Sequence, residues 1–290
     1  MTYSAKILAD SVSPAGVRLT TFEVTFPRIV LAEFNTHRMF SRNSASSRAV
    51  PVKKMIERVE ADPFVPDEFG KNKRGMQSEE SLDDEANHRA RECWDDARRF
   101  AVARARELAE IGVHKQFANR LLEPFLWHTC IVSSTEWSNF FHLRCHKDAH
   151  PAIRKPAEIM RDLYQGDDPE RIDYGEWHLP LIGPEDYDLA FEKGLTGGDS
   201  QALLMLMVKV SCARCARVSY LTHDGVRDLE KDLELHDRLL KSGHMSPFEH
   251  AAKPMEDSTT EGPFAFWGNF RGWTQYRKLI HGEADMLGGG

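Results

Sequence analysis

Apolar residues recur along this chain with two different periods, and a fold must accommodate both. Over residues 84–111 and again over 226–241 they return every three or four positions, which is typical of amphipathic helices. Over residues 19–26 they alternate with polar residues, which indicates a half-buried strand. No internal repeat or Pro/Ser-rich linker divides the chain. The sequence therefore predicts an α+β fold, with residues 1–290 forming a single domain in which helices pack on an antiparallel sheet.

Shorter signals predict where individual elements end. Pro124 should end a helix that begins shortly before it, because proline cannot continue the hydrogen-bond ladder. Ser134 or Thr135 should cap a following helix through a side-chain oxygen. Two stretches rich in turn-forming and charged residues are predicted to be surface loops, at 62–82 and 166–200.

Composition narrows the class of protein. Apolar residues make up 41% of the chain and charged residues 29%, which is an ordinary globular balance. The longest apolar runs, such as 203–208, fall far short of the roughly 18 residues that span a bilayer, and no secretory signal opens the sequence. Five cysteines are an odd number, typical of a reducing compartment. We therefore expect a cytoplasmic protein that does not bind a membrane. The net charge of −7 also argues against nucleic acid as its partner.

The strongest local signal is a basic segment within this acidic chain. No Asp or Glu occurs over residues 34–56, while Arg38, Arg42 and Arg48 alternate with short hydroxyl side chains. Guanidinium and hydroxyl groups together suit a phosphate or carboxylate, because arginine presents a planar pair of donors. A solvated basic loop has the same composition, so composition alone leaves both interpretations open.

Three further clusters carry weaker signals. The first is a set of candidate metal ligands at helical spacing: His142, Cys145, His146 and His150. Pro151 would disturb such a helix, so we expect no metal site. Cys212 and Cys215 lie in an apolar helical pattern and are predicted to pack in the core. In the segment 244–250, Ser246 is predicted to cap a helix. The N-terminus of that helix could bind an anion, or the segment could simply connect two elements, and the spacing does not decide between these interpretations.

Several common catalytic motifs do not occur in the sequence. There is no G-x-G-x-x-G after a strand, no Walker loop, no H-E-x-x-H and no G-x-S-x-G. These absences argue against a Rossmann dehydrogenase, a P-loop kinase and a serine hydrolase.

Taken together, the segments resemble the flavin-dependent thymidylate synthases. The family pattern R-H-R-x-x-S-x-N-E-x-S-x-R aligns without a gap on residues 36–48, the arginine–serine segment, with Thr36 in place of the first Arg and Ser44 in place of the Glu. Further family blocks correspond to Arg120–Pro124, Asn139–Arg144, Ala216–Ser219 and His244–His250. In the family the last two precede the arginine–serine segment, so this chain resembles a circularly permuted member. Such a rotation is physically reasonable because chain termini usually lie at the surface.

The resemblance implies an activity and its cofactors. Family members use FAD, NADPH and methylenetetrahydrofolate to convert dUMP into dTMP, as homotetramers with sites at subunit interfaces. The resemblance assigns dUMP contacts to Ser46, Arg48, Arg120 and Arg144. It assigns flavin contacts to His37, Arg38, Asn43, Asn139, Ser219, Ser246 and Glu249. Arg144 and Ser46 are the residues expected to act in catalysis, Arg144 by stabilising charge on the pyrimidine.

Departures from the family pattern leave other functions open. They are Glu33, Ser44, Asp148, His150 and Ala152, where the family has Gln, Glu, His, Gln and Glu. A pyrimidine hydroxymethyltransferase, a flavin- or nucleotide-binding protein without catalysis, and a metal-dependent hydrolase all remain alternatives. Residues 263–282 have no family counterpart, and we expect the site to include some of their polar side chains: Asn269, Arg271, Gln275 and Arg277.

Overall fold

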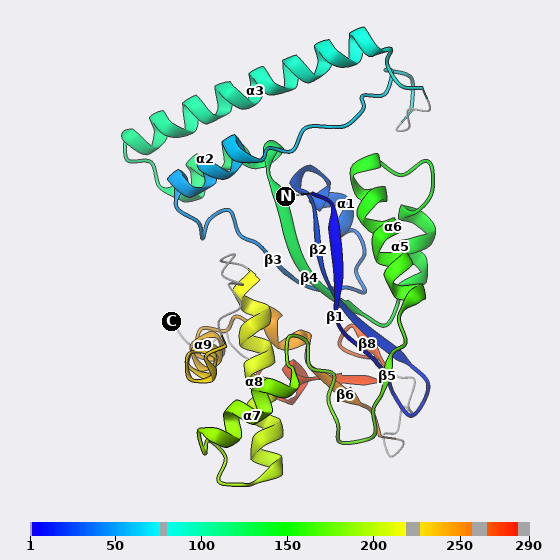
Figure 1. Cartoon of the computed structure of the whole chain (residues 1–290), viewed down its shortest axis with the longest axis vertical. Helices are drawn as coiled ribbons and strands as arrows, with labels where there is room; N and C mark the ends of the chain where they lie inside the picture. Colours follow the sequence, from blue (N-terminus) through cyan, green and yellow to red (C-terminus); the bar gives the residue numbers. More distant parts are fainter. Residues whose placement is uncertain (1, 76–79, 219–226, 257–265, 284–290) are drawn as a thin grey trace.

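The centre of the structure is a five-stranded sheet with the strand order β3-β4-β2-β1-β5 (Figure 1). The computed structural model describes residues 2–75, 80–218, 227–256 and 266–283. The strands are β1 (Ser4–Val12), β2 (Arg18–Pro27), β3 (Ser41–Ser44), β4 (Trp127–Ser134) and β5 (Glu170–Arg171). Neighbouring strands are antiparallel, except that the short edge strand β5 runs parallel to β1. The predicted α+β class is confirmed.

A second, smaller sheet is built from the C-terminal part of the chain, in the order β6-β9-β7-β8. Its strands are β6 (Ala252–Pro254), β7 (Phe266–Trp267), β8 (Phe270–Arg271) and β9 (Trp273–Gln275). Phe270 and Trp273, both 0% exposed, pack in one cluster with Leu19 of β2. The C-terminal chain is thus anchored on the large sheet.

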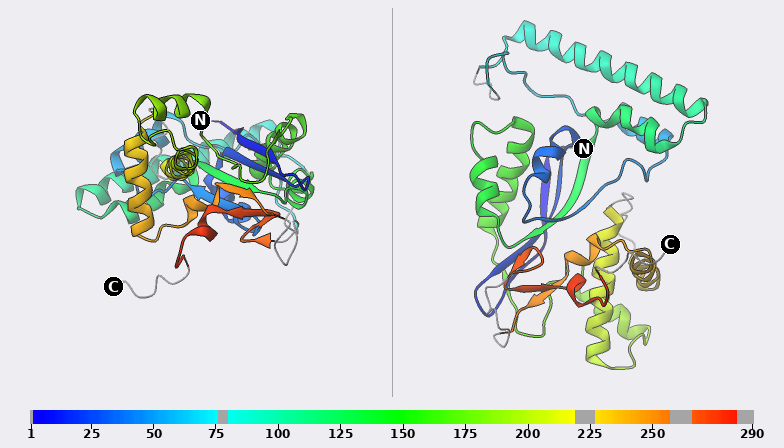
Figure 2. Two further views of the ribbon diagram at one scale, coloured as in Figure 1. Left: turned by 90° about the horizontal axis from the view of Figure 1, so that it is seen from below. Right: turned by 180° about the vertical axis from the view of Figure 1, so that it is seen from behind.

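Helices surround the two sheets in three groups (Figures 1 and 2). One face of the large sheet is covered by α5 (Ser138–Arg144) and α6 (Pro151–Gly166). An outer layer at one end consists of α2 (Val52–Ala61) and α3 (Asp84–Glu110), and the other end carries α7 (Pro184–Glu192), α8 (Ser200–Arg217) and α9 (Leu229–Lys241). The short helices are α1 (Leu31–Asn35), α4 (Lys115–Ala118), and the 3-10 helices η1 (Arg28–Val30), η2 (Asn119–Phe125), η4 (Ser246–Glu249) and η5 (Tyr276–Leu279).

The main core fills the space between β2 and the helices α1, α5 and α6. Phe22 of β2, Phe34 of α1, Phe140 of α5 and Ile153 of α6 are each at most 1% exposed. Burying one such side chain contributes about 1.5–3 kcal/mol. This core fixes both the helix that leads into the arginine–serine segment and the helix that ends at Arg144.

The elements with a strong periodic pattern form as predicted. α3 begins after Asp83, whose carboxylate accepts a hydrogen bond from the Ala86 N–H at 2.8 Å. It ends shortly before Gly112, which has a φ of +90°, and α9 ends shortly before Gly243, with a φ of +71°. Glycine suits both positions because other residues are strained in a left-handed backbone.

β2 is buried on both faces, although the alternation predicted a half-buried strand. Thr21 and Thr25, polar members of the pattern, are 0% and 8% exposed, and Thr20 on the opposite face is 0% exposed. Thr20 Oγ1 donates to Asp10 Oδ1 at 2.8 Å, and Thr21 joins a chain of buried polar groups described below. The threonines of β2 can be buried, although they are polar, because their hydroxyl groups form hydrogen bonds inside the protein.

The segment 166–200 contains a helix that was predicted to be a loop. α7 begins at Pro184, with Gly183 as its N-cap, and the Gly183 N–H donates to Asp186 Oδ2 at 2.9 Å. Glycine and proline are common in turns, but proline is also favoured in the first turn of a helix. The same residues therefore fit both interpretations, and the tertiary contacts of Asp186 decide between them.

One predicted boundary is confirmed and another is wrong. The helical stretch through Phe117 and Leu121 passes from α4 into the tighter η2 and ends at Phe125, one residue after Pro124. Neither Ser134 nor Thr135 caps α5, whose N-cap is Trp137 and receives no side-chain bond. Thr135 Oγ1 instead accepts a hydrogen bond from the Arg271 N–H at 3.0 Å, so a tertiary contact replaces the local cap.

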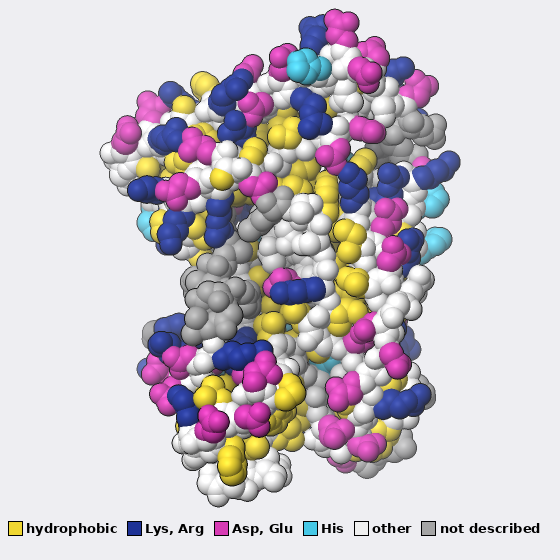
Figure 3. Space-filling model, in the orientation of Figure 1, with side chains coloured by type: hydrophobic (Ala, Val, Ile, Leu, Met, Phe, Trp, Pro, Cys, Tyr) yellow, Lys and Arg dark blue, Asp and Glu magenta, His cyan; other side chains and the backbone are white. Residues whose placement is uncertain are grey.

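The surface carries charges of both signs. On the face seen in Figure 3, acidic and basic side chains are interspersed. Along the longest helix, α3, Arg99 pairs with Asp95 and Asp96 within one turn, an arrangement that supports an exposed helix. No helix in the described part of the chain combines the length and apolar composition that a membrane crossing requires.

Candidate active site

Three sequence blocks meet at Asn43 in the edge strand β3. Asn43 is 5% exposed, and its Nδ2 donates to the carbonyl oxygen of Cys215 near the end of α8 at 2.9 Å. Its Oδ1 accepts a hydrogen bond from the Ser246 hydroxyl at 2.8 Å. The arginine–serine segment therefore contacts the His244–His250 block through Ser246, and it contacts α8 at Cys215, the residue just before the Ala216–Ser219 block. The rotated motif order leaves these blocks adjacent in space.

Residues of the C-terminal sheet hold the same region together. Ser41 Oγ, 0% exposed, accepts hydrogen bonds from Gln275 Nε2 at 2.9 Å and from Asn269 Nδ2 at 3.3 Å. Arg277 Nη1 donates to Glu249 Oε1 at 2.5 Å. The described part of the 263–282 segment thus lies against the arginine–serine segment and η4.

A hollow of about 370 Å³, here called the His37 hollow, opens beside α5. Its lining includes three predicted flavin contacts, His37, Arg38 and Asn139. The rings of Phe40 and Phe140 pack on the His37 ring, with centroids 5.6 and 4.9 Å away. The hollow therefore combines a cation, an amide and an imidazole with aromatic packing.

Arg144 determines which nitrogen of His37 carries the proton. Arg144 Nε donates to His37 Nε2 at 2.9 Å, and Arg144 Nη2 donates to Thr36 Oγ1 at 3.1 Å. Because arginine can only donate, the His37 proton lies on Nδ1. Burial, followed by the charges of Arg144 and Arg42, lowers the pKa of His37 to about 4. His37 is therefore neutral near pH 7 and leaves the positive charge of Arg144 uncompensated.

Two of the four predicted dUMP contacts line a different hollow, of about 360 Å³, here called the Ser46 hollow. Two predicted flavin contacts, Asn43 and Ser246, line it as well. Ser46 and the exposed Arg48 both line it. Arg120 lies close to this loop, because Arg120 Nη1 and the Ser47 hydroxyl donate to the same oxygen of Glu123, at 2.8 and 2.7 Å. Guanidinium groups and a hydroxyl thus gather at one end of the arginine–serine segment.

The two predicted catalytic residues line separate hollows. Arg144 lines a hollow with His146 and Asp148, whereas Ser46 lines the Ser46 hollow. Arg144 reaches the His37 hollow through its hydrogen bond to His37 but does not line that hollow. We refer to Arg144 with the His37 hollow as the Arg144 half-site, and to Ser46 with Arg48 as the Ser46 half-site.

Positions that depart from the family pattern lie close to both half-sites. The backbone oxygen of Glu33 accepts a hydrogen bond from Arg144 Nη2 at 3.3 Å. Asp148 lines the same hollow as Arg144. Ser44 Oγ donates to the sulfur of Cys130 at 3.4 Å, so its side chain is used within the sheet.

A chain of buried polar groups connects His250, next to Glu249, with the large sheet. His250 Nδ1 lies 2.8 Å from Ser133 Oγ, which lies 2.6 Å from Thr21 Oγ1, which in turn lies 2.8 Å from His178 Nε2. Burial lowers the pKa of both histidines to about 3. Each neutral imidazole can donate through one nitrogen and accept through the other, so the chain joins η4 to β2 and β4.

These histidines predict a fold that loses stability in acid. An unfolded histidine has a pKa of about 6.5, so the unfolded chain binds protons at these two positions below that pH. In the folded protein, His178 and His250 bind protons only near pH 3. The free energy of unfolding should fall as the pH drops below about 6.5, by up to about 1.4 kcal/mol per pH unit for each histidine. Urea unfolding at several pH values measures this slope.

A matched pair of variants isolates the histidine contribution. His178→Gln should give a shallower slope than the wild type, because one buried titrating group is gone. His88→Gln, at a position whose side chain is 75% exposed, should keep the wild-type slope. If His178→Gln also keeps the wild-type slope, His178 is not held neutral in the fold.

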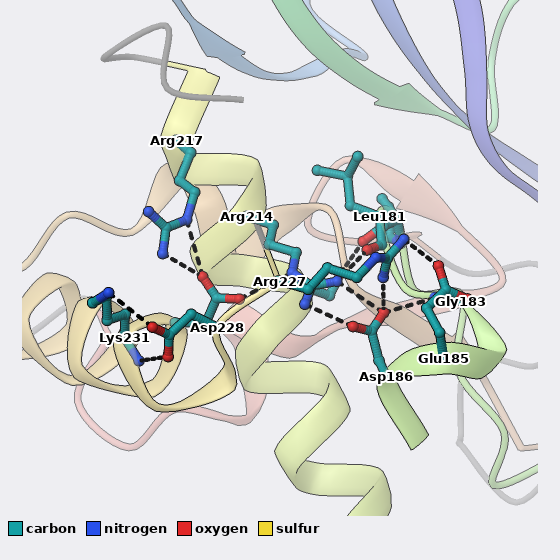
Figure 4. Close-up of polar contacts among 12 residues, drawn as sticks. Leu181, Gly183, Glu185, Asp186, Arg214, Arg217, Arg227, Asp228 and Lys231 are labelled. Carbon is teal, nitrogen blue, oxygen red and sulfur yellow. Dashed lines mark hydrogen bonds and ion pairs between the residues drawn. The ribbon is translucent and has the colours of Figure 1, made fainter. Parts of the chain in front are cut away.

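Buried ion pairs hold α8 between α7 and α9 (Figure 4). Arg214 of α8 donates to Asp186 of α7 through Nη1 and Nη2, at 2.8 and 2.7 Å, and to Asp232 of α9 through Nε, at 3.0 Å. Arg217 also pairs with Asp232, and Arg227 with Asp186. Both carboxylates are at most 1% exposed. The cluster therefore fixes the end of α8, where the backbone meets the arginine–serine segment.

The candidate metal ligands do not share one helix face. α5 ends at Arg144, and His150 is the N-cap of α6, with Nδ1 accepting a hydrogen bond from the Ala152 N–H at 3.1 Å. Among the described residues, no group of three or more His, Cys, Asp or Glu is placed to hold a metal ion. Cys212 and Cys215 are fully buried, and burial raises the pKa of both thiols. Their predicted packing in the core is confirmed.

Some site predictions need correction or fall outside the described residues. Ser246 does not cap a helix, because it lies inside η4, whose N-cap is Met245. Ser219, a predicted flavin contact, lies outside the described residues. Phe266 and Glu136 line the His37 hollow but were not predicted, since neither belongs to a recognisable motif.

A family model identifies the family to which this chain belongs. The family model described as thymidylate synthase complementing protein (Thy1) matches residues 9–170, which include the arginine–serine segment and α5. No curated protein matches the chain. Among similar solved structures are two of the UMP/dUMP methylase PolB from Streptomyces cacaoi, bound with 5-Br UMP and with 5-Br dUMP. The sequence identity is 17% in both cases. Each match covers 56% of this chain, and the two matches cover 88% and 90% of the PolB chain, with TM-scores of 0.48 and 0.46.

Proposed function

Because the chain belongs to the thymidylate synthase complementing protein family, we propose that it is a flavin-dependent thymidylate synthase. The proposed reaction converts dUMP into dTMP, with methylenetetrahydrofolate as carbon donor, NADPH as reductant and FAD as cofactor. The observation that carries this proposal is the pair of half-sites built around the arginine–serine segment, one rich in guanidinium and hydroxyl groups and the other containing Arg144 beside the neutral His37.

The residues of the two hollows fit these reactants. In the Ser46 hollow, Arg48 can donate two parallel hydrogen bonds to the dUMP phosphate while Ser46 adds a close hydroxyl. In the His37 hollow, the exposed Arg38 and Asn139 offer a cation and an amide to a ring cofactor that carries negative charge. When bound and reduced by NADPH, FAD would supply the hydride that completes the methyl group. The protein contributes binding and orientation.

Arg144 is the residue that acts on the pyrimidine in this proposal. Hydrogen bonds to His37 Nε2, Thr36 Oγ1 and the Glu33 carbonyl hold its guanidinium in place. All three acceptors are neutral, so the full positive charge remains available. A preorganised cation of this kind stabilises negative charge as it develops on the uracil ring.

A second copy of the chain completes the site in this proposal. Arg144 and Ser46 line different hollows of one chain. In a symmetric assembly, the Arg144 half-site of one chain can face the Ser46 half-site of its neighbour. We therefore extend the proposal to a homotetramer with interfacial sites, the arrangement that the family resemblance implies.

Product mass is the direct test. The purified protein is supplied with dUMP, FAD, methylenetetrahydrofolate and NADPH, and the nucleotide product is identified by mass spectrometry. We expect dTMP, formed together with an equal amount of NADP⁺. A product that retains an oxygen on the new carbon, without NADPH oxidation, would identify a hydroxymethyltransferase. Bound flavin with no nucleotide product would contradict both activities.

A further inference from the structure

A β-hairpin in the C-terminal part of the chain forms one wall of the His37 hollow. It consists of β7 and β8, in which Phe266 pairs with Arg271 across a turn that contains Gly268 at a φ of +83°. Phe266 and Arg271 both line the hollow, together with Arg38. The hairpin lies outside the residues 9–170 that the family model matches, so this wall is not part of that match.

Hydrogen bonds hold the hairpin against the hollow. The Arg271 N–H donates to Thr135 Oγ1 at 3.0 Å, and Arg271 Nε donates to Glu136 Oε1 at 2.7 Å. Asn269 Nδ2, in the turn, donates to Ser41 Oγ at 3.3 Å. The wall is therefore in place before a ligand arrives, which lowers the ordering cost of binding.

The wall offers an accessible ring beside positive charge. Phe266 is 41% exposed, and Arg271 Cζ lies 4.8 Å from the centroid of the Phe266 ring. Among the described residues, the guanidinium of Arg271 donates through Nε alone, so its two terminal nitrogens remain as donors. Arg38 adds a second exposed cation, and His37 is neutral near pH 7. The ion pair with Arg271 neutralises Glu136, which leaves the hollow net positive.

We propose that Phe266 and Arg271 form a subsite for a ligand that combines a planar heteroaromatic ring with an anionic group. The ring stacks on Phe266, and the anionic part of the ligand meets the terminal nitrogens of Arg271. This subsite rests on the proposed function, which requires two reactants of this chemistry, FAD and a reduced folate. dUMP is assigned to the Ser46 hollow, because its phosphate fits Ser46 and Arg48.

Ligand titrations of the full chain test this subsite. FAD and folic acid are each titrated by fluorescence into the wild type, Phe266→Ala and Arg271→Ala. We expect the Kd of at least one ring ligand to rise about tenfold in each variant, because a stacking or charged contact is lost. A rise for FAD alone identifies the flavin as the occupant, and a rise for folic acid alone identifies the pterin. Phe266→Tyr keeps the ring and should keep the wild-type Kd.

Trp267→Ala is the matched control. Trp267 is 42% exposed, follows Phe266 in the same strand, and therefore points to the opposite face. Its Kd values should stay within about twofold of the wild type. Equal losses in Trp267→Ala and Phe266→Ala would attribute the effect to hairpin stability and overturn the subsite. Unchanged ring-ligand Kd values in Phe266→Ala, or a rise for dUMP alone, would also overturn it.

The subsite and the proposed function can fail separately. If the wild type makes dTMP while Phe266→Ala binds both ring ligands normally, the subsite is wrong and the function stands. If the wild type binds a ring ligand through Phe266 but makes no dTMP, the function is wrong and the subsite stands. A wild type that binds neither FAD nor folic acid overturns both.

Discussion

The Arg144→Ala protein is expected to lose nearly all conversion of dUMP while it still binds FAD. The guanidinium of Arg144 is fixed by His37 Nε2 at 2.9 Å and by Thr36 Oγ1 at 3.1 Å, so its charge is positioned before substrate binds. Removing one preorganised stabilising group from an active site lowers kcat by about 10²–10³-fold, and we expect a loss of that size. Turnover at saturating dUMP measures kcat, and a fluorescence titration measures the Kd for FAD.

Two control variants separate the position of the charge from its presence. Arg104→Ala removes an arginine of α3 whose side chain is 50% exposed, and it should keep the wild-type kcat. Arg144→Lys keeps a positive charge but loses the planar donor geometry, so it should recover only part of the activity. Wild-type kcat in Arg144→Ala would mean that another group acts on the pyrimidine.

Mixed assemblies test whether the two half-sites come from different chains. Arg48→Ala damages the Ser46 hollow, whereas Arg144→Ala damages the other half-site. Each variant alone should be nearly inactive. When the two variants are co-expressed and mix at random, half of the chain pairs contain one chain of each variant. In such a mixed pair, one of the two interfacial sites has both half-sites intact and the other has both damaged. Activity should therefore return to about a quarter of the wild-type activity. No recovery would show that each site lies within a single chain.

The elements that could be predicted from the sequence are those whose own pattern is sufficient. The long amphipathic stretches predicted α3 and α9 correctly. An amphipathic helix can bury its apolar face against any apolar surface, so its prediction does not depend on knowing which element it packs against. α7 could not be predicted in this way, since Gly183 and Pro184 suit a turn as well as a helix start. The deciding contact joins Asp186 to Arg214, 28 residues further along the chain.

The site could be predicted only through the family resemblance. Spacing within the arginine–serine segment shows which donors are present but not which of them face inward. Asn43, predicted as a flavin contact, uses its amide to reach Cys215, 172 residues away. No local signal marks Phe266 or Glu136, because the His37 hollow is closed by long-range contacts such as the bond from Arg271 to Glu136, 135 residues apart.

The Asp186→Ala protein is expected to lose about 3–5 kcal/mol in free energy of unfolding. Asp186 is 0% exposed and accepts hydrogen bonds from Arg214, Arg227 and the Gly183 N–H. Burial alone would raise the pKa of Asp186, but these hydrogen bonds outweigh burial and lower it, so the carboxylate is ionised near pH 7. Its removal leaves the buried guanidinium of Arg214 with Asp232 as its remaining carboxylate.

Urea unfolding measures the loss, and Glu185→Ala supplies the control. Glu185 also pairs with Arg227, but its side chain is 54% exposed, so its removal should cost less than about 1 kcal/mol. Asp186→Asn keeps an acceptor for Gly183 without the charge and should fall between the two. An Asp186→Ala protein within about 1 kcal/mol of the wild type would mean that Asp232 alone neutralises Arg214.

The same variants connect this cluster to the site. Arg214 and Cys215 are consecutive in α8, and the Cys215 carbonyl receives the hydrogen bond of Asn43, which lines the Ser46 hollow. Loosening α8 should therefore weaken dUMP binding in Asp186→Ala at temperatures where the protein is still folded. A dUMP titration far below the unfolding transition detects this effect, and Glu185→Ala should bind dUMP as the wild type does. Unchanged dUMP affinity in Asp186→Ala would show that Asn43 is held in place without the ion pairs of α8.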